Sequence, residues 1–421
     1  MTETVKNKGW IVTLSGTGIN LALGILYTWS IFKASIQKTI EANQGGFNWN
    51  PAKLNDPYSI CCLAFAFSMI LAGKVQDKFG PKTTALIGGI LVSLGLIWIS
   101  QSTSYAVWTL GFGLLAGSGI GFGYSAATPP ALKWFPPQKT GMIAGIVVSG
   151  FGLASVYIAP LSEYLLKNFG INKAMFIYGI AFLIVVCGLS FFLVNPPAGY
   201  RPPPSSLQED SRKPKAFSAV EVGPSKIIKM GKFYLLWLIF FIGAGAGLMV
   251  ISNINGMAKK SFGSAAFLAV VILAVGNASG RIIAGTLSDK IGRHQTLTIM
   301  LSFQAVLMFL AVPLVGGAHP NPMLMVLLAT FMGFNYGTNL SIFPSLAKDN
   351  WGLKNFGMNY GLLFTAWGMG GFVMSRVSQM LQIRSGSYSS SFLAAGLLLV
   401  GGILLTFLIR KKSTNPPGSG V

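Results

Sequence analysis

Two stretches of the sequence follow one pattern: Gly73-Lys-Val-Gln-Asp77-Lys78-Phe-Gly80-Pro-Lys82 and Gly285-Thr-Leu-Ser-Asp289-Lys290-Ile-Gly292-Arg293-His294. Each follows a long apolar run, and the two copies start 212 residues apart. A second pair, Gly141-Met142-Ile-Ala-Gly145 and Gly357-Met358-Asn-Tyr-Gly361, is offset by 216 residues. Two pairs of similar motifs, separated by nearly the same number of residues, predict that the chain contains two repeats in parallel orientation.

Apolar runs surround both motifs along the whole chain. Of the 421 residues 52% are hydrophobic and 10% are charged, and the mean hydropathy is +0.61. A soluble protein carries about 25% charged residues, and a membrane helix needs about 20 apolar residues. The sequence therefore predicts an all-α membrane protein with twelve transmembrane helices, at 9–32, 53–76, 83–101, 105–133, 139–165, 171–194, 231–257, 264–288, 295–316, 321–347, 356–382 and 388–410.

The sequence changes character in the middle of the chain. Residues 195–230 are rich in proline, serine and charge, a composition that cannot bury a core. We interpret them as a cytoplasmic central loop. They separate an N-terminal six-helix half, 1–194, from a C-terminal six-helix half, 231–421.

Basic residues set the expected orientation. Twenty-one of the 31 Lys and Arg residues fall in the termini, the central loop and the loops on the same side, and nine fall on the opposite side. The positive-inside rule then places both termini in the cytoplasm, with the chain in the cell (inner) membrane. Anchoring to the lipid bilayer explains the net charge of +21, so we expect no nucleic-acid partner.

Enzyme, metal and cofactor chemistry have no visible support. Cys61, Cys62 and Cys187 lie in apolar runs and indicate core packing, whereas His294 and His319 fall in separate loops. The glycines of 117–123 lack the spacing of a nucleotide-binding loop. We expect no metal site, no cofactor and no enzymatic activity.

Arg281 is the most informative residue. It precedes Asp289 by eight positions, about 12 Å along a helix, which places it near the middle of the membrane. An arginine there is costly, and no acid is expected at the same depth. Its planar guanidinium fits a carboxylate bidentately, so we predict that Arg281 binds the substrate anion.

Other polar and aromatic residues are predicted to line the same site. Asn277 lies one helical turn before Arg281 and is suited to orient the guanidinium or to donate to the anion. Phenol and indole groups near the middle of their spans suit a small acid with a short carbon chain; they are Tyr27, Tyr124, Tyr336, Tyr360 and Trp367. Asn253, Asn335 and Asn339 are alternative polar residues of the lining.

The doubled motif resembles the signature of the major facilitator superfamily over nearly the whole chain. In that family the motif is understood as a latch between the two halves, which implies a gating role for Asp77 and Asp289. Lys8-Gly9-Trp10 and the stretch from Trp134 to Gly152 resemble the monocarboxylate transporters. Tyr27-Thr-Trp29-Ser and Asn359-Tyr360-Gly361 resemble the bacterial oxalate/formate exchangers.

Both resemblances imply a carrier of small organic acids. We expect a secondary transporter of lactate-like monocarboxylates that works as a monomer by alternating access, with proton-coupled symport. Monocarboxylate transporters commonly have an aspartate where this chain has Asn277, so a more peripheral acid such as Asp56, or the substrate itself, would carry the proton. The exchanger position on helix eleven that holds a second cation is Trp367 here, which leaves Arg281 as the one expected buried cation. The alternatives are an exchanger of the oxalate/formate type and a membrane receptor for organic acids that does not transport them.

Overall fold

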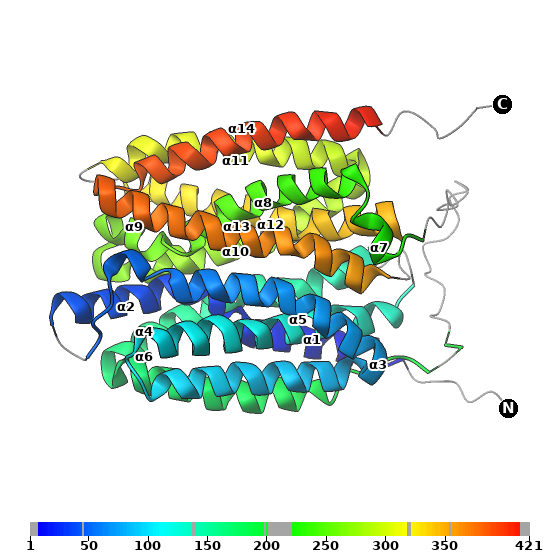
Figure 1. Ribbon diagram of the computed structural model, residues 1–421, viewed down its shortest axis with the longest axis horizontal. Helices are drawn as coiled ribbons and strands as arrows, with labels where there is room; N and C mark the ends of the chain where they lie inside the picture. Colours follow the sequence, from blue (N-terminus) through cyan, green and yellow to red (C-terminus); the bar gives the residue numbers. More distant parts are fainter. Residues whose placement is uncertain are drawn as a thin grey trace.

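The computed structural model describes residues 7–43, 46–136, 140–197, 199–200, 221–317, 321–352 and 355–412, apart from the side chains of residues 77, 140, 141, 260 and 410–412. The described chain is helical and forms one elongated bundle (Figure 1). Most of the predicted central loop, residues 201–220, lies outside the described residues.

The helices before residue 200 gather in the lower part of Figure 1. They are α1 (Gly9–Leu23), η1 (Gly24–Thr28), α2 (Trp29–Glu41), η2 (Pro51–Lys53), α3 (Asp56–Ser100), α4 (Tyr105–Trp108), the π-helical η3 (Thr109–Ala116), α5 (Gly117–Lys133) and α6 (Thr140–Ser190).

The helices after residue 220 gather above them. They are α7 (Pro224–Ile227), α8 (Gly231–Ile251), α9 (Ile254–Phe262), η5 (Gly263–Ala265), α10 (Phe267–Ile291), α11 (Arg293–Gly316), α12 (Pro322–Trp351), α13 (Phe356–Ser385) and α14 (Ser389–Lys412). The start of α1, the end of α14 and α7 lie at one end of the bundle, on the right of Figure 1. We call this the inner end and the opposite one the outer end.

Ten segments of the described chain are long and apolar enough to cross a membrane. One of them, Met142–Ser190, has 49 residues and contains a non-helical Gly170. The 30-residue α13 is not among the ten. Large apolar side chains such as Leu14, Leu310 and Leu404 are at least 60% exposed, as expected of residues that face lipid.

The two copies of the motif have the same backbone geometry. Gly80 has φ 82° and ψ 171°, and Gly292, at the matching position, has φ 96° and ψ 149°. A side chain at such a positive φ is strained, so glycine is required at each turn. Both glycines reverse the chain at the inner end, between one long helix and the next.

Two predicted helices are interrupted. The first continues to Glu41 but breaks at η1, where a Cβ on Gly24 would lie 2.2 Å from Ala154 Cβ. The predicted helix 231–257 ends at Ile251, because the Ser252 and Asn253 side chains both bond the Met249 carbonyl. Side-chain bonds of this kind compete with the helical backbone ladder. Hydrophobicity alone does not reveal either break.

Helices α10 and α12 approach each other on small residues. A Cβ on Gly276 or Gly280 would lie about 2 Å from a carbonyl oxygen of α12, and a Cβ on Gly333 or Gly337 equally close to one of α10. Such small-residue seams let membrane helices pack at backbone distance. The seam fixes the position of Arg281 and Asn277 on α10 relative to Tyr336 on α12.

Candidate functional site

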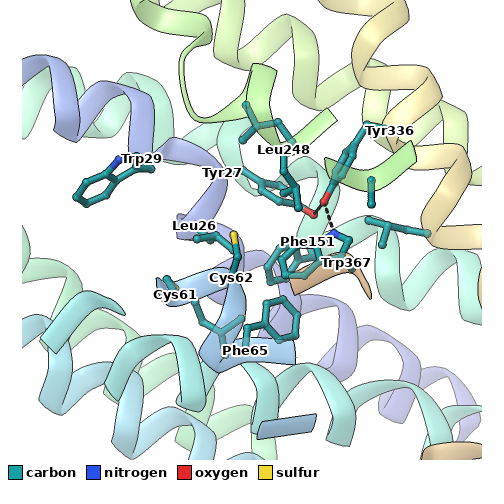
Figure 2. Close-up of a cluster of buried hydrophobic side chains, with 14 of the residues drawn as sticks. Leu26, Tyr27, Trp29, Cys61, Cys62, Phe65, Phe151, Leu248, Tyr336 and Trp367 are labelled. Atoms are coloured by element: carbon teal, nitrogen blue, oxygen red, sulfur yellow. Dashed lines mark hydrogen bonds between the residues drawn. The ribbon is translucent and has the colours of Figure 1, made fainter. Parts of the chain in front are cut away.

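Three aromatic side chains from both halves form a hydrogen-bonded group at the centre of the bundle (Figure 2). The Tyr27 hydroxyl lies 2.6 Å from the Tyr336 hydroxyl, which accepts a 2.8 Å bond from Trp367 Nε1. All three side chains are at most 3% exposed. η1 presents Tyr27, α12 presents Tyr336 and α13 presents Trp367, so this group links the break in the first span to the C-terminal half.

Arg281 is buried on α10 without a carboxylate partner among the described residues. Its Nε donates to Asn277 Oδ1 at 3.0 Å, and Nη1 donates to the Val148 carbonyl of α6 at 2.6 Å. Nη2 makes no hydrogen bond, although the Tyr124 hydroxyl lies beside the guanidinium. Asn277 Nδ2 also has no partner. The guanidinium and the amide thus leave two buried N–H groups free to bind an acceptor.

Aromatic rings join Arg281 to the central group. Phe151, next to Gly152, contacts Tyr27 and Tyr124 with ring centroids 4.9 and 5.4 Å apart. A Cβ on Gly152 would lie 3.4 Å from Arg281 Nε, which is ordinary van der Waals contact, so α6 passes directly beside the guanidinium at this residue. The ring centroid of Phe364 on α13 lies 5.5 Å from that of Tyr360 and 4.9 Å from that of Trp367.

All seven residues that the sequence indicated for binding are buried. Tyr27 and Tyr124 contact the Phe151 ring, and Tyr360 and Trp367 contact the Phe364 ring. Arg281 and Asn277 lie beside Gly152, and Tyr336 joins the group through its hydrogen bonds. The alternative residues Asn335 and Asn339 donate to carbonyls of their own helix. Sequence reasoning missed Phe151 and Phe364, because an apolar ring inside an apolar run carries no signal of its own.

The expectation of a single buried cation is wrong, because Lys33 is also buried. The predicted helix 9–32 ends just before Lys33, but α2 continues past this residue and only 3% of Lys33 is exposed. Its Nζ donates to Asn253 Oδ1 and, at 3.2 Å, to Gln379 Oε1. Asn253 therefore belongs with Lys33 and Gln379 and not with the residues around Arg281. With two buried cations, the number of buried positive charges does not by itself favour a monoanion over a dianion as the substrate.

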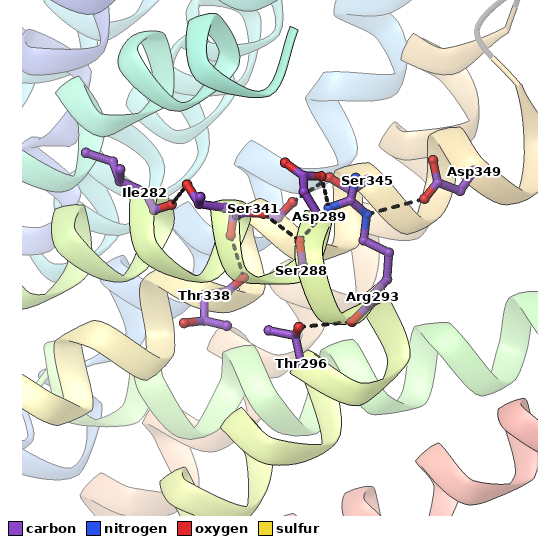
Figure 3. Close-up of polar contacts among 12 residues, drawn as sticks. Ile282, Ser288, Asp289, Arg293, Thr296, Thr338, Ser341, Ser345 and Asp349 are labelled. Atoms are coloured by element: carbon purple, nitrogen blue, oxygen red, sulfur yellow. Dashed lines mark hydrogen bonds and ion pairs between the residues drawn. The ribbon is translucent and has the colours of Figure 1, made fainter. Parts of the chain in front are cut away.

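Of the two motif acids, Asp77 and Asp289, the structure describes the side chain of Asp289. Asp289 is 57% exposed and forms a 2.6 Å ion pair with Arg293, which also contacts Asp349 of α12 at 3.3 Å (Figure 3). These charges all belong to the C-terminal half. The side chain of Asp77 lies outside the described residues, so the latch stays a prediction.

The two halves are in contact from the outer end to the inner end. Along α3 and α13, Asn55 bonds the Ser375 carbonyl, and Cys62 packs on Gly368 and Gly371. Further in, Gly361 packs on Ile70, and Gly357 packs on Gly73. These contacts hold α3 of the N-terminal half against α13 of the C-terminal half along most of their length.

Residues 10–375 match the model of the major facilitator superfamily, and the chain belongs to this family of transporters. It is thus a multi-pass membrane transporter and not an enzyme.

Three relatives match over most of their length. The chain is 30% identical over 380 residues to the uncharacterized MFS-type transporter YhjX of Escherichia coli, covering 86% of this chain and 85% of that protein. It is 25% identical over 385 residues to the oxalate:formate antiporter of Oxalobacter formigenes, covering 87% and 82%. It is 25% identical over 421 residues to monocarboxylate transporter 13 of Rattus norvegicus, covering 97% and 92%.

Proposed function

We propose that this protein carries small monocarboxylates of about the size of lactate across the cell membrane by alternating access. Twelve helices form halves 1–194 and 231–421, joined by a cytoplasmic loop. Gly170 divides Met142–Ser190 into two crossings, and α13 is one more beside the ten apolar segments. The two halves rock around the central cluster, and both termini face the cytoplasm. Relatives that carry the names of monocarboxylate and oxalate/formate transporters support the substrate class.

One observation carries the proposal, namely the surroundings of Arg281. A buried guanidinium whose neighbours are neutral groups, namely an amide, a carbonyl and the Tyr124 hydroxyl, keeps its full charge uncompensated. A bound carboxylate supplies the missing charge and accepts from Arg281 Nη2 and Asn277 Nδ2. The rings of Phe151 and Phe364 enclose the short carbon chain beside it. A monoanion neutralises the guanidinium. It thereby favours the closed state through which the carrier passes between its outward-open and inward-open forms.

Proton-coupled symport is the proposed mode of transport, because an empty carrier has to return with Arg281 uncompensated. In proteoliposomes, an inward proton gradient is expected to drive labelled lactate above its outside concentration, and an uncoupler is expected to abolish this accumulation. Substrate that exchanges but never accumulates with the gradient would instead indicate an exchanger. The experiment therefore decides between the proposed mode and the oxalate/formate type of transport.

We also propose that Asp77 and Asp289 stabilise the closed inner end in the manner of a latch. Asp77→Asn is then expected to open the inner end more often, because its charge no longer complements a neighbouring helix end. A cysteine placed at the buried Gly73, where its Cβ would lie 3.8 Å from Gly357 of the other half, should react faster with a maleimide in this variant. Equal rates in the variant and in the parent would leave the motif as a turn that only anchors charge.

A further inference from the structure

Asp56 stands apart from the other acids of the chain. The structure describes the side chains of six acids: Glu41, Asp56, Glu163, Glu221, Asp289 and Asp349. Among these six only Asp56 is buried, with 5% of its side chain exposed. It is the first residue of α3, at the outer end of the bundle, far from the motif acids.

An ion pair joins Asp56 to the opposite half of the protein. Asp56 Oδ1 lies 2.9 Å from Arg376 Nε on α13, and the Arg376 side chain is 43% exposed. Asp56 Oδ2 accepts a 2.6 Å hydrogen bond from the Tyr105 hydroxyl of α4. Tyr105 belongs to the same half as Asp56, whereas Arg376 belongs to the other. Of the ion pairs found among the described residues, this is the one that crosses between the halves.

Neutral hydrogen bonds surround this pair. The amide of Asn55 donates to Asn253 Oδ1 at 3.2 Å and to the Ser375 carbonyl at 3.3 Å, and Lys33 also reaches Asn253. These bonds hold the outer ends together, but amides do not titrate. Among the interactions that join the halves here, the carboxylate of Asp56 is the one that a proton at acidic pH removes directly.

We propose that Asp56 is a proton-binding site that controls the opening of the outer face. Ionised Asp56 holds Arg376 and keeps the outer ends of α3 and α13 together. Protonated Asp56 keeps its bond to Tyr105 but releases Arg376, whose exposed guanidinium then returns to water. A proton arriving from outside thus favours the state that admits substrate. This inference rests on the alternating access of the proposed function and not on the identity of the substrate.

Four charged or titratable groups face Asp56 or its immediate partners. Arg376 comes from α13 and Tyr105 from α4, while Lys53 of η2 lies 5.4 Å above the Tyr105 ring. Lys33 of α2 reaches the pair through Asn253 and Asn55. Lys33 bonds Asn253 and Gln379 of the other half, so its charge also acts on the contact between the halves, and the test includes a Lys33→Met variant.

The distance across the outer face tests the inference without substrate. Spin labels on the full chain at Lys38→Cys of α2 and Gln382→Cys of α13 report the separation of the halves by double electron–electron resonance. Both sites line a polar cavity of about 200 Å³ at this end. The native cysteines are first replaced by alanine; they are Cys61, Cys62 and Cys187.

We expect the ratio of long to short separations to rise roughly fivefold as pH falls from 8 to about 2.5, which is the size of effect of a partly exposed ion pair once an aspartate is protonated. Asp56→Asn and Arg376→Gln should each show the long separation already at pH 8, with no further response to pH. Glu41→Gln, which removes an exposed carboxylate of the same end, should behave as the parent, and Lys33→Met should keep the response.

The inference is overturned if Asp56→Asn still responds to pH, or if both Asp56→Asn and Arg376→Gln keep the short separation at pH 8. Loss of the response in Lys33→Met alone would assign the proton to the lysine and overturn it as well. Asp56→Asn is nearly isosteric and strands no buried charge, because the cation that it frees, Arg376, is partly exposed, so this variant is expected to fold. A failure of lactate transport would leave all of these distances unchanged, so the two proposals fail separately.

Discussion

Arg281→Gln is expected to weaken lactate binding by roughly 100-fold or more, because the charge-assisted hydrogen bond from Nη2 and the balancing charge are lost together. Arg281→Lys keeps the charge but loses the planar fork, so a loss of roughly tenfold or more is expected. Isothermal titration of lactate into the purified protein measures both. The Gln variant should fold, because removing a buried charge relieves its desolvation cost.

Arg384→Gln is the matched control for this experiment. Arg384 lies near the end of α13 and is exposed, so its loss removes the same charge without touching the central cluster. Affinity of the control should equal that of the parent. Unchanged affinity in Arg281→Gln, with the protein monodisperse, would remove Arg281 from the binding site.

Gly333→Ala is expected to lower the stability of the protein by roughly 1–3 kcal/mol, the usual cost of overpacking. The added Cβ would lie 2.1 Å from the Leu273 carbonyl oxygen, a backbone atom that moves only if α10 and α12 separate. Thermal unfolding in detergent, followed by tryptophan fluorescence, should show a lower midpoint. The loss exceeds the gain in helix propensity that alanine brings.

Gly145→Ala provides the comparison for this change. Gly145 lies within α6, and a Cβ there would meet nothing within 4 Å. The same substitution should leave the midpoint unchanged or raise it slightly. If Gly333→Ala unfolds at the same temperature as the parent, the close seam that positions Arg281 and Asn277 against Tyr336 does not exist.

The repeat and the central cluster were accessible from the sequence because each depends on a strong energetic cost. A turn at positive φ requires glycine, so the same residue recurs at matching positions of the two repeats, as Gly80 and Gly292 do. A charge in the middle of an apolar run is costly, and the structure buries Arg281 as that cost requires. The family match confirms the membership that the doubled motif predicted.

Features that depend on contacts between distant segments were not accessible. The break after Ile251 arises from side-chain bonds to the Met249 carbonyl, and apolar periodicity is unchanged across it. Lys33 lies just after the predicted end of the first helix, where a charged residue favours a loop. In the structure α2 continues past this boundary, and Lys33 is buried. The pairing of Asp56 with Arg376 joins residues 320 positions apart, which hydropathy does not reveal.

Counterflow is the most direct test of a monocarboxylate carrier built around Arg281. Proteoliposomes are loaded with unlabelled lactate, and the entry of labelled lactate is followed without any pH gradient, so that the result does not depend on proton coupling. Rapid entry is expected with the parent protein and with Arg384→Gln, and entry no faster than in empty liposomes is expected with Arg281→Gln. Equal entry with the parent and Arg281→Gln, or no exchange of lactate, pyruvate or acetate by the parent, would contradict it.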